Sequence, residues 1–206
     1  MIKEILKKNN KNSGFTIIET MIAISLFLVV VMMGMGALLN ANVLHNKAQK
    51  MRSIMDNLSF IMEDMSRNLR TGSTYHCIDA NDTLAALDTA RSGPDCSGIA
   101  FESATGDPTT PNDQWVYFID NSSGTGKIFK STTGFDGGNF VQLNPDEVNI
   151  DPNASGFFVL GAEPPPGDTQ QPFVIIRLVG TITYQSVTTP FSLQTSVSQR
   201  LIDVAP

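Results

Sequence analysis

The feature that most constrains this chain is an uncharged stretch near its start. Residues 20–46 contain no Asp, Glu, Lys or Arg, and the apolar centre of the stretch covers residues 21–39. A helix needs roughly 20 apolar residues to cross the hydrocarbon core of a bilayer. The residues before it are basic, and the positive-inside rule predicts that they stay in the cytoplasm while the rest of the chain lies outside. Residues 1–14 contain Lys3, Lys7, Lys8 and Lys11, against the single acid Glu4.

The processing signal of this chain precedes the apolar stretch. A secretory signal peptide has a shorter apolar region followed by a small-residue cleavage site, and no such site follows here. Instead, Ser13-Gly14-Phe15 leads into Glu19 at the edge of the apolar helix. A charge at the bilayer centre costs at least about 2.5–3.5 kcal/mol. The cost is smaller near the edge, but we still expect Glu19 to have a partner.

The segment KNSGFTIIETMIAISLFLVVV, residues 11–31, resembles the N-terminus of type IV prepilins and type II secretion pseudopilins. The pattern of that family is a short basic leader, a glycine, an aromatic residue that is usually phenylalanine, and a glutamate at the fifth position of the mature chain. Gly14, Phe15 and Glu19 match it position by position. The resemblance covers about 30 of the 206 residues.

The resemblance implies a sequence of events at these three residues. A prepilin peptidase cuts between Gly14 and Phe15 on the cytoplasmic side, and the new amino group of Phe15 is N-methylated. Glu19 then pairs with the Phe15 ammonium of a neighbouring subunit as helices bundle into a filament. Such a pair is strong only where water is excluded. The alternative is a plain signal anchor in which Glu19 occurs by chance.

A helical apolar pattern continues beyond the uncharged stretch. Apolar residues recur at alternating steps of four and three, which is an a/d-type stripe, and Gly72 follows as a C-cap glycine would. We expect one helix over residues 15–71, about 85 Å long. Its second half should bury the stripe against a sheet, and a methionine-lined binding groove is the alternative. The stripe comprises Leu44, Ala48, Met51, Met55, Leu58, Met62, Met65 and Leu69.

The remaining residues, 72–206, are rich in Gly, Pro, Asn, Ser and Thr and predict short strands joined by long turns. The last two strands should form an antiparallel hairpin with a turn within residues 185–190. The segment TPFSLQTSVSQRLID, residues 189–203, also resembles the C-terminal strand of J-type and W-type minor pilins. Candidate strands cover residues 98–102, 114–120, 127–131, 139–143, 156–160, 173–184 and 188–202.

Four segments follow from these patterns. Residues 1–14 form a prepilin leader, residues 15–40 the membrane-spanning or filament-core half of the helix, and residues 41–71 its amphipathic half. Residues 72–206 form an extracytoplasmic β-rich domain. The expected fold class is α+β and pilin-like, with a long N-terminal helix packed on a C-terminal antiparallel sheet.

The two cysteines lie in the exported part of the chain, where Cys77 and Cys96 are expected to form a disulfide. Closing this loop should stabilise the fold by about 3 kcal/mol. The alternative is a nucleophilic Cys77 beside His76. Adjacent strand residues point to opposite faces, and no third group that would orient them is evident.

Composition excludes or disfavours several other kinds of site. Two histidines and two cysteines cannot supply a Cys₄ or His₃ zinc site. Residues 72–206 carry 5 basic and 15 acidic side chains, so broad nucleic-acid binding is not expected. The acidic turns at residues 136–139 and 144–147 could hold calcium but lack EF-hand spacing, and no other cofactor is expected.

The sequence therefore predicts a structural subunit rather than an enzyme. We expect a minor pilin or pseudopilin that spans the inner membrane once, with its N-terminus in the cytoplasm. It would then enter a type IV pilus or a type II secretion pseudopilus, as an initiating, capping or shaft subunit. Its partners would be other pilins, the prepilin peptidase and a membrane-embedded assembly platform. The alternatives are a membrane-anchored binding module, such as an adhesin or a DNA-uptake tip protein, and an anchored hydrolase.

Overall fold

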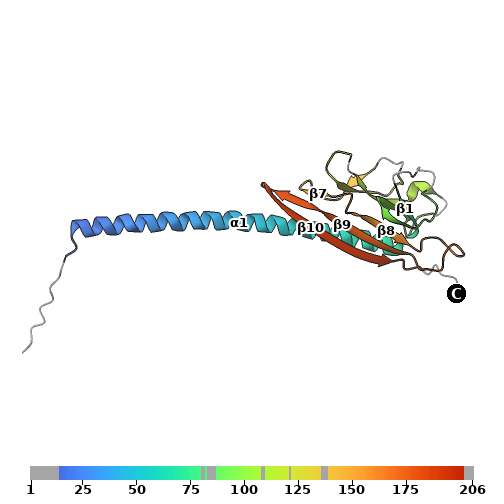
Figure 1. Ribbon diagram of the computed structural model, residues 1–206, viewed down its shortest axis with the longest axis horizontal. Coiled ribbons are helices and arrows are strands. Elements are labelled where there is room, and N and C mark those ends of the chain that lie inside the picture. Colours follow the sequence, from blue (N-terminus) through green and yellow to red (C-terminus); the bar gives the residue numbers. More distant parts are fainter. Residues whose placement is uncertain are drawn as a thin grey trace, which may run out of the picture. The chain divides into compact units, whose positions relative to one another are not determined.

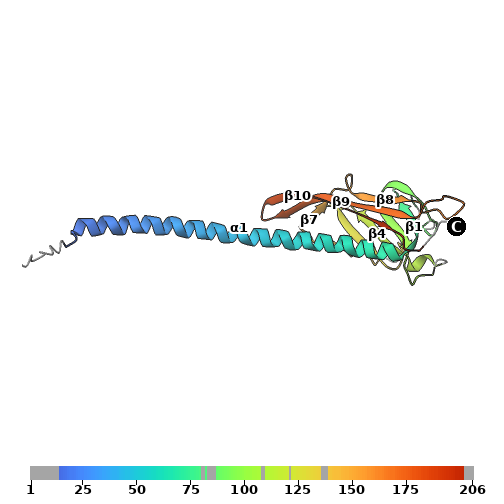
Figure 2. The same ribbon diagram turned by 90° about the horizontal axis from the view of Figure 1, so that it is seen from below.

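The computed structural model describes residues 14–79, 82, 87–107, 110–120, 122–135 and 139–201. The chain divides into two compact units, Met1–Ala48 and Gln49–Pro206. Of the predicted leader, only Gly14 is among the described residues. One long helix belongs in part to each unit (Figures 1 and 2).

The helix α1 covers Ile17–Thr71. It begins two residues later than the pattern predicts and ends where predicted. At its C-terminus, the Gly72 N–H donates to the carbonyls of Asn68 and Leu69 at 3.0 and 3.2 Å. These bonds close the last turn of the helix, as a C-terminal glycine commonly does.

Within the second unit, the apolar stripe of α1 faces the core. Met62, Met65 and Leu69 are buried, and Met51 and Met55 pack against the core from its margin. The prediction that the methionine stripe is core is confirmed for this part. It is wrong at the start of the stripe, where Leu44 and Ala48 are exposed.

The strands form two antiparallel sheets rather than the single predicted sheet. The first has the order β1-β3-β4-β5-β6, with the 3₁₀ helix η2 (Pro111–Asp113) before β4. Its strands are β1 (Ser73–Ile78), β3 (Gly98–Glu102), β4 (Trp115–Asp120), β5 (Lys127–Ser131) and β6 (Val141–Gln142). The second has the order β10-β9-β8-β2, and β7 also pairs with β9. Its strands are β2 (Gly93–Cys96), β7 (Val148–Ile150), β8 (Gly156–Leu160), β9 (Phe173–Tyr184) and β10 (Val187–Ser198).

The predicted strands agree with the structure at β3, β5, β8 and β9, and β4 begins one residue late. The predicted strand 139–143 is reduced to the two residues of β6. The sequence did not predict β1, β2 or β7. The predicted last strand is also too long, because β10 ends at Ser198, and Ile202 lies outside the described residues.

The hairpin of β9 and β10 turns more tightly than predicted. Only Gln185 and Ser186 separate the two strands, and both have positive φ angles, 46° and 64°. Positive φ at both central residues is the requirement of a type I′ turn, which matches the twist of the strands. Pro190 lies inside β10, opposite Thr181, and not in the turn. An edge strand tolerates proline where its missing N–H faces away from the sheet.

Two tyrosines join the last turn of α1 to the first sheet. The Tyr75 hydroxyl donates to the Leu69 carbonyl, one of the helix-end acceptors that needs a partner. The Asn68 amide donates to the Tyr117 hydroxyl at 2.8 Å. Burial raises the pKa of both phenols well above the usual range. The helix end is therefore fixed to the sheet through neutral hydroxyl groups.

Candidate assembly site at the amino-terminal helix

The residues that precede α1 are accessible. Gly14, Phe15 and Thr16 are exposed and lie outside the helix, and the Phe15 side chain is 79% exposed. A peptidase must bind its substrate around the bond that it cuts, which a helical hydrogen-bond ladder would hinder. The bond between Gly14 and Phe15 therefore lies in a segment that a peptidase can bind without first unwinding α1.

Thr16 caps the N-terminus of α1. Its hydroxyl accepts a hydrogen bond from the Glu19 N–H at 3.4 Å. Its carbonyl accepts from the N–H groups of Glu19 and Thr20, at 3.1 and 3.2 Å. A threonine followed three residues later by glutamate is the capping-box pattern. The sequence contains this signal, but our sequence-based interpretation did not use it.

The cap places Glu19 in the first turn of α1, where a negative charge is favourable beside the positive end of the helix dipole. This position gives Glu19 a local role in addition to the predicted role in assembly. Its carboxylate makes no hydrogen bond or ion pair with any residue that the structure describes. Among the described residues, none therefore competes with a cation from another molecule for this carboxylate.

The first unit exposes almost all of its apolar side chains. Within the described residues, α1 is the one helix long and apolar enough to cross a membrane, and its most apolar window is entirely unburied. Ile17, Phe27 and Leu38, for example, are between 65% and 82% exposed. A water-soluble protein rarely exposes so large an apolar surface. Lipid or other apolar helices must cover it, as expected for a single membrane anchor.

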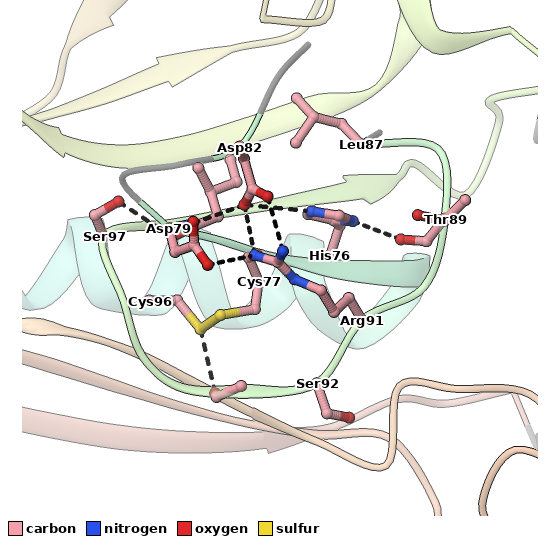
Figure 3. A network of polar contacts seen from close by, with 12 residues as sticks. His76, Cys77, Asp79, Asp82, Leu87, Thr89, Arg91, Ser92, Cys96 and Ser97 are labelled. Atoms are coloured by element: carbon pink, nitrogen blue, oxygen red, sulfur yellow. Dashed lines mark hydrogen bonds and ion pairs between the residues drawn. A yellow bond between two sulfur atoms is a disulfide. The ribbon is translucent and has the colours of Figure 1, made fainter. Parts of the chain in front are cut away.

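The predicted disulfide is present between Cys77 in β1 and Cys96 in β2 (Figure 3). The Cα atoms are 5.3 Å apart, within the usual range for a disulfide. Gly93 is required beside it, because a Cβ atom at this position would lie 2.5 Å from the Cys77 sulfur. The alternative of a nucleophilic Cys77 is wrong in this oxidised state, because the sulfur is bonded and cannot act as a thiolate.

A polar network surrounds the disulfide (Figure 3). The Arg91 guanidinium donates to the Cys77 carbonyl and forms ion pairs with Asp82 and Asp79. Burial by itself would raise the pKa of Asp82. The Asp79 N–H and the Arg91 side chain outweigh it and hold the pKa below its usual value. This arrangement ties Arg91 to the end of β1 and to Asp82.

His76 belongs to the same network. It is 1% exposed, and its Nδ1 lies 2.6 Å from the Thr89 carbonyl. Its Nε2 lies 3.6 Å from the Asp82 carboxylate. The ring is enclosed and faces a carbonyl and a carboxylate, so its geometry is that of a structural histidine in the core.

In the acidic turn at residues 144–147, backbone carbonyls are contacted by a lysine side chain of the protein itself. The Lys127 ammonium donates to the carbonyls of Pro145, Asp146 and Val148 at 2.9–3.3 Å. The Asn144 side-chain oxygen accepts from the Ile128 N–H at 2.8 Å. Three backbone carbonyls around this turn and the Asn144 side-chain oxygen therefore already accept hydrogen bonds. Residues 136–138 of the other candidate turn lie outside the described residues.

The comparison with family models identifies the N-terminal region. The model described as the prokaryotic N-terminal methylation motif matches residues 9–35, which include Gly14, Phe15 and Glu19. No curated protein and no solved structure matched the chain. The J-type or W-type subclass is not confirmed by these comparisons. The chain therefore carries a type IV prepilin-like N-terminal motif on an apolar helix, which supports a pilin or pseudopilin precursor.

Proposed function

We propose that this protein is a minor pilin or pseudopilin. In this proposal a prepilin peptidase processes it, and it enters a type IV pilus or a type II secretion pseudopilus. The observation that carries the proposal is the position of Glu19. Glu19 lies in the first turn of an exposed apolar helix, has no ion-pair partner among the described residues, and belongs to a segment that matches the N-terminal methylation motif.

Processing supplies a cation for Glu19. Hydrolysis of the bond between Gly14 and Phe15 leaves a carboxylate on Gly14 and an ammonium on Phe15, and the amine is then N-methylated. Two unit charges 4 Å apart attract each other by about 4 kcal/mol at an effective dielectric constant of 20. This attraction would offset the cost of carrying both charges into an apolar helix bundle.

The geometry of the helix end favours pairing between subunits. Thr16 already accepts the Glu19 N–H, so the first turn is ordered before assembly. The apolar side chains that follow need a cover when the subunit leaves the lipid. Neighbouring helices supply that cover in a filament, through a head-to-tail contact that can repeat without closing.

The proposal also covers the subclass of the subunit, its place in the filament and its topology in the membrane. The subunit would be of the J or W type and would initiate or cap the filament with other pilins at an assembly platform. Before assembly it would span the inner membrane once, with its N-terminus in the cytoplasm. Its role would be structural rather than enzymatic and would need no cofactor.

The test compares two carboxylates of the same helix. Glu19→Gln should leave leader removal intact but strongly reduce incorporation into sheared filaments or the pseudopilus fraction. Asp56→Asn is the matched control, because Asp56 is exposed on the second half of α1 and does not line the groove described in the next subsection. Equal incorporation of the Glu19 variant and the control would refute the pairing of charges.

A membrane-anchored binding module is the second candidate, and the groove described in the next subsection favours it. It would retain the same helix but would not form filaments. Localisation separates the two functions: a filament subunit is recovered with sheared filaments, and a binding module stays dispersed in the membrane.

A further inference from the structure

The last strand, β10, has a free edge. It pairs only with β9 among the described strands, and the two form a long hairpin (Figures 1 and 2). In an antiparallel pair, alternate residues direct both backbone groups toward the partner strand, and the others direct them away. The Gln199 N–H donates to the Pro172 carbonyl at 3.0 Å, one step beyond the pair Ser198–Phe173. The odd-numbered residues of β10 therefore bond to β9.

The even-numbered residues of β10 direct their N–H and C=O groups to the free edge. Val179, which lies opposite Ser192, confirms this phase, because its own backbone groups bond to Ser155 and Asp151 on its other side. The even-numbered residues Ser192, Gln194 and Ser196 make no backbone hydrogen bond across this edge within the described chain. Several backbone donors and acceptors in a row therefore have no partner in the part of the chain that the structure describes.

This free edge faces the second half of α1. Beyond β10, the Arg200 N–H points the same way as those of the even-numbered strand residues and donates to the Arg70 carbonyl at 2.9 Å. Between the residues that precede Arg200 in β10 and those that precede or include Arg70 in α1, the strand and the helix are further apart. They leave a groove with adjoining cavities of about 420 and 340 Å³. From α1 the groove is lined by Ser59, Met62, Glu63, Ser66, Arg67 and Arg70; from β10 it is lined by residues 193–198.

The groove has an apolar floor and a polar rim. Met62 and Val197 are 7% and 6% exposed, and Leu193 packs against the same core. A strand laid against β10 would place alternate side chains on this floor and the others toward solvent. The spacing of the free backbone groups and the apolar floor together suit an extended polypeptide segment. Binding of such a segment along a strand edge is known as β-strand addition.

The edge lacks the charged residues and bulges that often prevent such pairing. Natural edge strands carry charged residues, bulges or prolines that prevent association. β10 contains no charged residue, and its register with β9 is continuous over 12 residues. Pro190 lacks an N–H and hinders pairing only at the first part of the strand, before the groove begins. The edge from Ser192 onward is open to a partner.

The charge of the groove indicates the sign of the charge that a bound segment would carry. Glu63 pairs with Arg67, whereas the Arg70 side chain has no ion-pair partner among the described residues. This local positive charge contrasts with the net charge of −10 on residues 72–206. We propose that this groove binds an extended segment of a second protein chain by β-strand addition to β10, with a carboxylate of that segment beside Arg67 and Arg70.

The test uses the full-length chain in detergent micelles and a labelled peptide, Asp-Thr-Val-Thr-Val-Thr, acetylated and amidated. Antiparallel addition places its aspartate at the Ser198 end of the groove, beside the arginines. We expect saturable binding, measured by fluorescence anisotropy, and slower hydrogen exchange at the amides of Ser192, Gln194 and Ser196. The amides of Leu193 and Thr195 provide the internal control, since they already bond to β9 and should be protected with or without peptide.

Two variants at Ser196 distinguish the contribution of the backbone N–H to binding from that of the side chain. Ser196→Pro removes an N–H that faces the groove and should weaken binding at least tenfold, whereas Ser196→Ala keeps the N–H and should bind like the parent. Lysine in place of aspartate in the peptide should weaken binding about fivefold at low salt. Hydrogen exchange in the parent protein tests the proposal even if the proline variant does not fold.

Three results would overturn the proposal. One is an absence of binding at millimolar peptide, and the second is binding that leaves the three groove amides unprotected. The third is concentration-dependent protection of these amides without peptide, which would assign the edge to a second copy of this chain. None of these measurements depends on processing at Gly14, so failure here leaves the assembly proposal standing.

Discussion

Replacing Glu102 by glutamine should stabilise the protein. Glu102 ends β3 and is 2% exposed, and neither carboxylate oxygen has a hydrogen-bond partner of normal geometry among the described residues. Burial raises the pKa of this carboxyl, the Gln114 amide offsets part of the effect, and the nearby Asp113 and Asp107 raise it further. When this carboxyl is ionised, the fold therefore carries a buried charge without adequate compensation.

The magnitude follows from the cost of an unsatisfied buried group. Such a group costs about 1–3 kcal/mol, and more when it is charged. Glutamine removes the charge but remains polar, so we expect Glu102→Gln to gain about 1 kcal/mol at pH 7. For a unit of this size, that gain corresponds to a rise in Tm of about 2–4 °C.

The raised pKa of Glu102 determines in which direction stability changes with pH. Because the folded-state pKa of Glu102 lies above its ordinary value of 4.5, the folded state holds the proton more tightly than the unfolded state. Wild-type stability therefore falls as pH rises through the interval between these two pKa values. The advantage of Glu102→Gln should be absent below about pH 4 and complete once the pH exceeds the folded-state pKa.

Glu163 is the matched control because its carboxylate is well bonded. It accepts hydrogen bonds from the Ser92 N–H at 2.7 Å and from the Ser92 hydroxyl. Burial would raise its pKa, but these bonds outweigh burial and lower it. Glu163→Gln should therefore destabilise the protein at pH 7, and the difference should vanish as pH falls below the folded-state pKa.

The assay is thermal unfolding in detergent from pH 3.5 to 8, followed through the fluorescence of Trp115. This residue is the single tryptophan of the chain and lies 4.3 Å from the Lys130 ammonium, measured to the ring centroid. A Glu102→Gln variant that is less stable than wild type at pH 7, or equally stabilised at every pH, would refute the reasoning.

Three further changes test the fold by the same assay. Replacing Gln185 and Ser186 by Asn-Gly should raise stability by about 0.5–1 kcal/mol, since both positions have positive φ; lower stability would contradict the type I′ assignment. Met65→Ala, at 0% exposure, should cost about 2–5 kcal/mol, whereas Phe60→Ala, at 68% exposure, should change stability by less than about 0.5 kcal/mol; equal losses would disprove the buried stripe. Replacing both cysteines of the Cys77–Cys96 disulfide by alanine should cost about 3 kcal/mol, and an unchanged Tm would show that the loop needs no covalent closure.

The sequence predicted the elements whose signals are local and periodic. The helix followed from the uncharged run and the stripe through Met62 and Met65, and β9 from its alternation of apolar residues. The match at Gly14, Phe15 and Glu19 likewise depends on neighbouring residues. The cap at Thr16 was just as local, and its omission was an error of interpretation.

Elements that depend on distant residues could not be predicted in this way. β2 has the sequence GPDC, which strand propensity disfavours, and it forms through pairing with β8 and the bond of Cys96 to Cys77. The filling of the calcium-like turn by Lys127 needs β5 to lie beside that turn. The groove of β10 needs both the phase of its hydrogen bonds and the position of Arg70. Sequence patterns carry none of this information.

The most direct test of the assembly proposal is the N-terminal sequence and intact mass of the protein isolated from its native membrane or filament fraction. The proposal predicts a chain that begins at Phe15, with the mass of residues 15 onward plus one methyl group on the amine. A mature protein that still begins at Met1, or one cut after the apolar stretch, would contradict it, since Glu19 would then have no new ammonium to pair with.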